Sequence, residues 1–162
     1  MVGFRESLKL YGQLPADFQE KASYRRNVGI TSNNLAWLLA MSTSKERNID
    51  EAVAFAKQAV ELTPTAGSYW NTLGVAQYRA GDWKAAAEAI EKSMALRKGG
   101  DGDAFDWFVM AMIQRQRNDK AKAREWFDKA VAWIEKHEPK NEELIRFRAE
   151  AEAVLGIKEK GD

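Results

Sequence analysis

The stretch YWNTLGVAQYRAGDWKAAAEAIEKSMAL, which runs from Tyr69 to Leu96, decides the fold of this chain. Its first half places large apolar residues such as Trp70 and Leu73 at near-helical spacing. Gly81–Asp82 interrupts this pattern, because glycine tolerates a left-handed turn and aspartate can cap the helix that follows. The second half carries a ladder of small residues, which lets two helix backbones approach closely. The stretch therefore predicts two amphipathic helices folded into a hairpin.

The pattern of this hairpin occurs three times along the chain. The residues that mark its second helix have counterparts 34 residues earlier and 37 residues later. The three extra residues of the later interval fall in the polar segment KGGDGD, so the spacing inside the helices is unchanged. Insertions confined to loops predict an all-α solenoid of stacked helical hairpins. The corresponding residues are Ala52, Ala56, Ala59 and Leu62; Ala86, Ile90, Ser93 and Leu96; and Ala123, Phe127, Ala130 and Trp133.

The repeat resembles the tetratricopeptide repeat (TPR), whose pattern is W-x2-L-G-x2-Y followed by A-x3-F and a proline. The resemblance covers residues 30–137, although Gln77 stands where tyrosine is usual and Ala56 replaces phenylalanine. The segment ITSNNLAWLLA is similar to the longer repeats of kinesin light chains and of TPR arrays in bacterial multidomain proteins. The matching residues are Leu35, Ala36, Ala52 and Pro64; Trp70, Leu73, Gly74, Ala86 and Ile90; and Trp107, Met110, Ala111, Ala123 and Phe127.

Both ends of the chain fit a solenoid. The first hairpin is expected to begin with a long helix from about Ala22 to Met41. Near the other end, Leu144, Phe147 and Ala151 mark an apolar stripe on a charged helix, which is typical of the cap that shields the last face of an array. The predicted division is residues 1–21 as an N-terminal helix and linker left from a preceding repeat, 22–137 as three TPR-like hairpins, 138–156 as the capping helix and 157–162 as a tail.

Composition argues against several classes of function. Lysine and arginine number 25 against 24 acidic residues, so clustered positive charge for nucleic acid or an anionic membrane is not expected. The chain has no cysteine and one histidine, His137, which argues against a thiolate or multi-histidine metal site. No segment approaches the roughly 18 apolar residues that cross a bilayer. We therefore expect a cytoplasmic protein.

The remaining candidates for chemistry have simpler interpretations. The segment GGDGDAFD suggests a calcium loop, but an EF-hand needs glycine at its sixth position and glutamate at its twelfth, where this chain has Asp106 and Met112. An inter-repeat turn with an aspartate cap is favoured instead. His137 near a helix end complements the helix dipole. The sequence therefore predicts a non-enzymatic protein without a cofactor or metal.

The TPR resemblance implies a protein–protein interaction scaffold, because the first helices of TPR hairpins line a concave groove. We expect the partner to be a peptide or an amphipathic helix, with apolar anchors toward Tyr78, Phe108 and Met112 and acidic groups toward Arg79 and Arg115. Trp37 lies off the apolar stripe of its own helix. The groove positions by register are Asn33, Asn34 and Trp37; Asn71, Thr72, Val75, Tyr78 and Arg79; and Phe105, Phe108, Val109, Met112, Arg115 and Gln116.

Two alternatives remain open at this stage. The apolar residues Phe105, Phe108 and Met112 form either an exposed interface or a surface that the capping helix covers in part. The chain is either a monomeric or weakly self-associating scaffold, or a structural array element that mates with further repeats or a second copy. An acidic chaperone tail is not expected as the partner, because the carboxylate-clamp positions of the family carry almost no charge here. These positions are Asn33, Trp37, Thr72, Phe105 and Val109.

Overall fold

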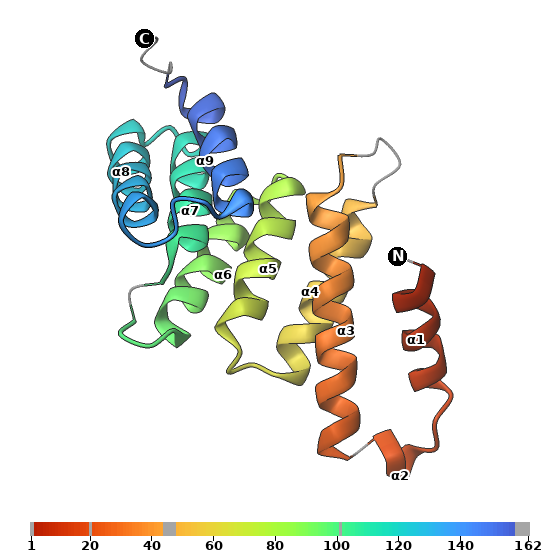
Figure 1. The fold of residues 1–162 in the computed structure, drawn as a ribbon. Helices are drawn as coiled ribbons and strands as arrows, with labels where there is room; N and C mark the ends of the chain where they lie inside the picture. The colour runs from red at the N-terminus through yellow and green to blue at the C-terminus, as the bar shows by residue number, and fades with distance from the viewer. Residues whose placement is uncertain (1, 20, 44–47, 101, 158–162) are drawn as a thin grey trace.

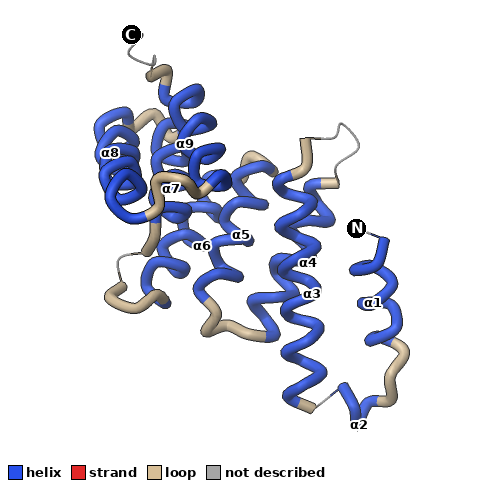
Figure 2. Tube along the Cα trace, viewed as in Figure 1, coloured by secondary structure: helices blue, strands red, loops and turns tan. Residues whose placement is uncertain are grey.

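A computed structural model describes residues 2–19, 21–43, 48–100 and 102–157. These residues form nine helices and no strand, which confirms the all-α prediction (Figures 1 and 2). In chain order the helices are α1 (Val2–Gly12), α2 (Ala16–Gln19), α3 (Ala22–Met41), α4 (Ile49–Leu62), α5 (Gly67–Arg79), α6 (Trp83–Leu96), α7 (Ala104–Gln116), α8 (Lys120–His137) and α9 (Glu142–Leu155).

Three helical hairpins, α3–α4, α5–α6 and α7–α8, stack along the array. Their second helices begin at the same kind of cap, since the side chains of Asn48, Asp82 and Asp119 each accept a hydrogen bond of 3.0 Å from a backbone N–H of the first turn. The turn before two of these caps is left-handed, with φ of 81° at Gly81 and 68° at Asn118. The turn and cap residues in the sequence, such as Gly81 and Asp82, therefore have the roles that their residue types predict.

Small residues keep the two helices of each hairpin close together. A Cβ atom added at Gly74 in α5 would lie 2.6 Å from Ile90 Cδ1 in α6, so the buried Ile90 side chain or the helices themselves would have to shift. The equivalent positions of the second helices, Ala59, Ser93 and Ala130, are fully buried. The predicted close approach of the two helices is thus confirmed at Gly74, and the predicted burial of the small residues is confirmed in the second helices.

The C-terminal helix α9 caps the array in an unusual way. The Asn141 side chain accepts hydrogen bonds from the N–H groups of Glu143 and Leu144, and Gly156 ends the helix at φ 73°. The first helices α5 and α7 each pack on the second helix of the preceding hairpin, α4 and α6. By contrast, α9 packs more extensively on α7 than on α8. It therefore lies across the face formed by the first helices of the hairpins.

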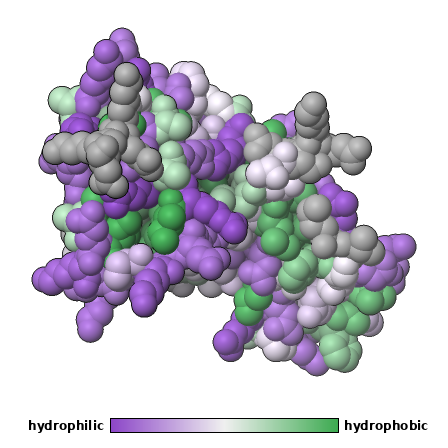
Figure 3. All heavy atoms as spheres, turned by 45° about the horizontal axis from the view of Figure 1, so that its top comes forward, coloured by the Kyte–Doolittle hydropathy of each residue, from purple (hydrophilic) through white to green (hydrophobic). Residues whose placement is uncertain are grey.

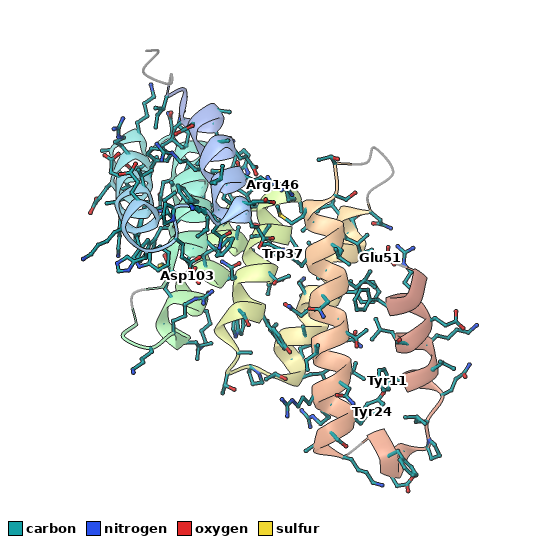
Figure 4. The ribbon with its side chains drawn as sticks, viewed as in Figure 1. Tyr11, Tyr24, Trp37, Glu51, Asp103 and Arg146 are labelled. Atoms are coloured by element: carbon teal, nitrogen blue, oxygen red, sulfur yellow. The ribbon has the colours of Figure 1, made fainter. Side chains whose placement is uncertain are left out.

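The N-terminal helices α1 and α2 lie at the opposite end of the array from α8 and α9 (Figure 1). Helix α1 packs beside α3, where the rings of Tyr11 and Tyr24 meet edge to face at 5.7 Å (Figure 4). Arg5 Nε donates to Glu51 Oε1 of α4 at 3.1 Å. Among the described helices, none has the length and apolar character that crossing a membrane requires.

Candidate functional site

A hollow of about 360 Å³ opens between the first helices of the three hairpins and the start of α9. Six of the predicted groove residues meet in it, two of them aromatic and four polar. The hollow also receives Glu143 from α9 and two charged residues from the α6–α7 connection, Arg97 and Asp103; Figure 4 labels Trp37 and Asp103. The lining residues are Asn33, Asn34, Trp37, Ser68, Asn71, Thr72, Arg97, Asp103, Phe105 and Glu143.

Several predicted groove residues on α7 are instead part of the core. Phe108, Val109 and Met112 are completely buried, so the expectation of an exposed apolar stripe is wrong at these positions. The reason is that α7 is covered on two sides: Phe108 packs against Phe127 of α8, with ring centroids 5.9 Å apart, and α9 packs on another side. These three side chains are out of a partner's reach. The alternative that the capping helix covers part of the stripe is supported.

On α5 the predicted residues divide between core and hollow. Val75 is buried. Asn71 and Thr72 are also largely buried, although both border the hollow. The Thr72 hydroxyl donates to the Ser68 carbonyl oxygen at 3.1 Å, which satisfies it within the helix. The exposed polar residues of the hollow are therefore Asn34 and Ser68 together with Glu143 of α9, and Arg97 and Asp103 are partly exposed.

A buried carboxylate fixes the wall of the hollow. Asp106 is fully buried, and its oxygens accept hydrogen bonds from Asn71 Nδ2 at 2.7 Å and from Arg97 Nε at 2.8 Å. Asp103 caps α7, as the turn interpretation of this segment predicts, and with Asp106 it forms a reciprocal capping box. Burial and the neighbouring charge of Asp106 raise the pKa of Asp103, and Arg97 opposes this shift in part. In the described part of the chain no cluster of His, Cys, Asp or Glu is arranged for a metal ion.

The predicted arginines have different surroundings. Arg79 forms a bidentate pair with Glu150 of α9, with Nη2–Oε2 at 2.6 Å. Burial disfavours the charge of Arg79, but the hydrogen bond and the charge of Glu150 outweigh it and raise the Arg79 pKa. The neighbouring Tyr78 is half-buried, and this burial raises its pKa. Arg115 is partly buried, and its Nε finds no hydrogen-bond acceptor among the described residues. The acidic group expected opposite Arg79 is thus supplied by the chain itself.

Helix α9 also contacts the first hairpin, which sequence reasoning missed. The ring of Phe147 stacks on Trp37 at 6.0 Å and meets Phe105 edge to face at 5.5 Å. Trp37 Nε1 donates to Glu143 Oε1 at 3.0 Å. The available signal was the position of Trp37 off its apolar stripe, together with the glutamates that flank Phe147 on one face of α9.

Comparison with known families supports the TPR resemblance. A family model described as tetratricopeptide repeat matches residues 107–137, which cover most of the α7–α8 hairpin. No curated protein matches the chain. The finer likeness to kinesin light chains and to bacterial multidomain proteins stays a prediction.

Proposed function

We propose that the chain is a non-enzymatic scaffold that binds a peptide or helix of a partner protein in the hollow on its concave face. The observation that carries this proposal is the convergence of side chains from three successive hairpins on one hollow. TPR hairpins usually form protein-interaction modules, and the match to residues 107–137 supports that class of function. The solenoid supplies the surface because each hairpin contacts only its neighbours.

The chemistry of the hollow suits a polypeptide. Trp37 and Phe105 offer aromatic surface for an apolar anchor. Asn34 and Ser68 offer hydrogen-bond donors and acceptors for a peptide backbone. Aromatic anchors surrounded by polar groups are the usual anatomy of a protein interface, in which the buried ring supplies affinity and the polar rim fixes orientation.

The proposal is tested with peptides selected from a displayed library against the parent chain. The dissociation constant of a selected peptide is then measured by calorimetry for Asn34→Tyr and Ser68→Tyr, which fill the hollow from α3 and α5. We expect binding to weaken about tenfold or more, equivalent to about 1.4 kcal/mol. The matched control is Lys92→Tyr, at an exposed position of α6 that does not line the hollow.

Equal affinity for the parent and both hollow variants would place the binding surface elsewhere. Failure to select any peptide would argue against the scaffold function itself. A peptide ending in EEVD is expected not to bind, because a carboxylate held without a cluster of cations lacks the charge-assisted hydrogen bonds that make such sites strong.

A second candidate function, that of a structural array element, is favoured by one observation. Leu10, Leu14 and Phe18 are exposed on and beside α1 and α2, and apolar surface is visible at this end of the molecule (Figure 3). Such a surface suits contact with a further repeat or a second copy. Mass measurement at two protein concentrations separates the candidates, because only the array element is expected to associate. Leu10→Lys should then abolish association through this end and leave peptide binding unchanged.

A further inference from the structure

Helix α9 contacts the array as a bound helix would, rather than as the next helix of the repeat. A continuing first helix would pack mainly on α8, in the way that α7 packs on α6, but α9 packs mainly on α7. It also reaches α5 through the pair between Arg79 and Glu150, and α3 through the contacts of Trp37. One helix therefore touches the first helix of all three hairpins.

Besides the buried Leu144 and Ala151, three side chains of α9 make ring, hydrogen-bond and ion-pair contacts with the first helices, and these three share one face. Phe147 lies against both Trp37 and Phe105. Glu143 precedes Phe147 by one helical turn and accepts from the Trp37 indole, whereas Glu150 follows it by about one turn and pairs with Arg79. Residues at i, i+4 and i+7 align along a helix. The covered surface thus recognises the order acidic, aromatic, acidic over two turns.

From these contacts we propose that α9 is an internal occupant of the concave face, displaced by a partner helix with an acidic residue, an aromatic residue and a second acidic residue at i, i+4 and i+7. The inference rests on the proposed scaffold function and names the chemistry of its partner. Arg79 supplies the complementary charge and Trp37 with Phe105 supplies the aromatic seat.

A partner helix has one advantage over α9. Glu143 lies at the edge of the hollow and belongs to the first turn of α9, so α9 leaves most of the hollow empty. A partner helix with further residues on the N-terminal side of its first acidic residue would enter the hollow. These residues would contact Asn34 and Ser68 in addition to the surface that α9 covers. These contacts offset the advantage that α9 has from its short connection to α8, which holds it at an effective concentration on the order of millimolar.

The test uses the full chain and a synthetic fluorescent peptide that carries residues 138–157 of the same sequence. In Phe147→Ala Glu150→Gln, the internal helix is weakened while Trp37, Arg79 and Phe105 stay intact. Fluorescence anisotropy is expected to show that the peptide binds this variant at least about tenfold more tightly than the parent, since the competing internal contact is reduced. Ile145→Ala, at an exposed position of α9, is the matched control and should bind like the parent.

Two further measurements make the result specific. A peptide with alanine at the position of Phe147 should not bind the double variant, and Arg79→Glu added to the double variant should abolish binding of the intact peptide. If the double variant shows no cooperative melt, the single Glu150→Gln variant is judged by the same criterion, with a smaller expected gain.

The proposal is overturned if the peptide binds a folded α9 variant no better than it binds the parent, since α9 is then a fixed cap. In that case library peptides that still bind the parent hollow leave the scaffold function standing. If neither kind of peptide binds, both proposals fail.

Discussion

Helices α3 and α7 hold the same place in their hairpins and yet present different surfaces. Along α7, every residue from Ala104 to Ile113 is buried except Phe105, which is partly so. Along α3, Ile30, Asn34 and Leu38 remain exposed. The difference arises because α9 covers α7 and touches α3 at the ring of Trp37. Equivalent register in a solenoid therefore does not give equivalent exposure, and the face formed by the first helices is divided into a covered part and an open part.

The largest expected effect lies in α5, the helix between the two parts. Gly74→Leu should prevent folding or destabilise the chain by more than the roughly 1–3 kcal/mol typical of overpacking. The added side chain would begin 2.6 Å from Ile90 Cδ1. Circular dichroism melts would report the loss.

The matched control is Gly3→Leu in α1, where an added Cβ meets nothing within 4 Å. If Gly74→Leu melts within a few degrees of the parent, the close approach of α5 and α6 does not exist. The alignment of the first helices on the second helices of their hairpins would then have to be different.

The second prediction sharpens the contrast between α7 and α3 directly. Met112→Ala should destabilise the chain by about 2–5 kcal/mol, the range for deleting a large buried apolar side chain, because Met112 is fully buried. Leu38→Ala should cost less than about 1 kcal/mol, since Leu38 is 43% exposed. Urea unfolding followed by tryptophan fluorescence measures both. Similar costs for the two substitutions would show that α7 and α3 are equally covered.

The smallest expected effect concerns the α7 end of the hollow. Asp103→Asn keeps a residue that can cap α7 but removes its titration. The raised pKa means that folded Asp103 binds its proton at a higher pH than the unfolded chain does. Its contribution to stability is therefore fully present below the ordinary carboxyl pKa and is lost as pH rises through the folded pKa.

The free energy of unfolding of the parent, relative to that of Asp103→Asn, should accordingly increase as pH falls from about 6 to about 4. Urea titrations at several pH values measure the difference. A difference that is constant or decreases toward low pH would contradict the burial of Asp103 beside Asp106.

The elements of the fold could be predicted because their signals are local. The predicted long helix from Ala22 to Met41 has those bounds in the structure. Gly81 and Asp82 act within one turn of the chain, and the small residues of each hairpin pack against a neighbour close in sequence. Such signals can be read from a short window, and the threefold repetition strengthens each one.

The surface of the groove could be predicted only in part, because it depends on contacts between distant segments. Trp37 and Glu143 are 106 residues apart in sequence, and no periodicity encodes the hydrogen bond between them. For the same reason the register placed Phe108 in the groove, although its ring packs toward α8. The hydrogen bonds of buried Asp106 were not predicted, because its link to Asn71 of the previous hairpin is likewise non-local.

The path of α9 also sets the order in which the chain can fold. Helical hairpins that touch only their neighbours can form anywhere in an array and propagate from there. The bond between Trp37 and Glu143 instead closes a loop of 106 residues, whose entropy cost is recovered only when the intervening hairpins already stand in place. We therefore expect the contact between α9 and Trp37 to form last in folding and to be lost first, so that the face formed by the first helices is assembled before this contact closes on it.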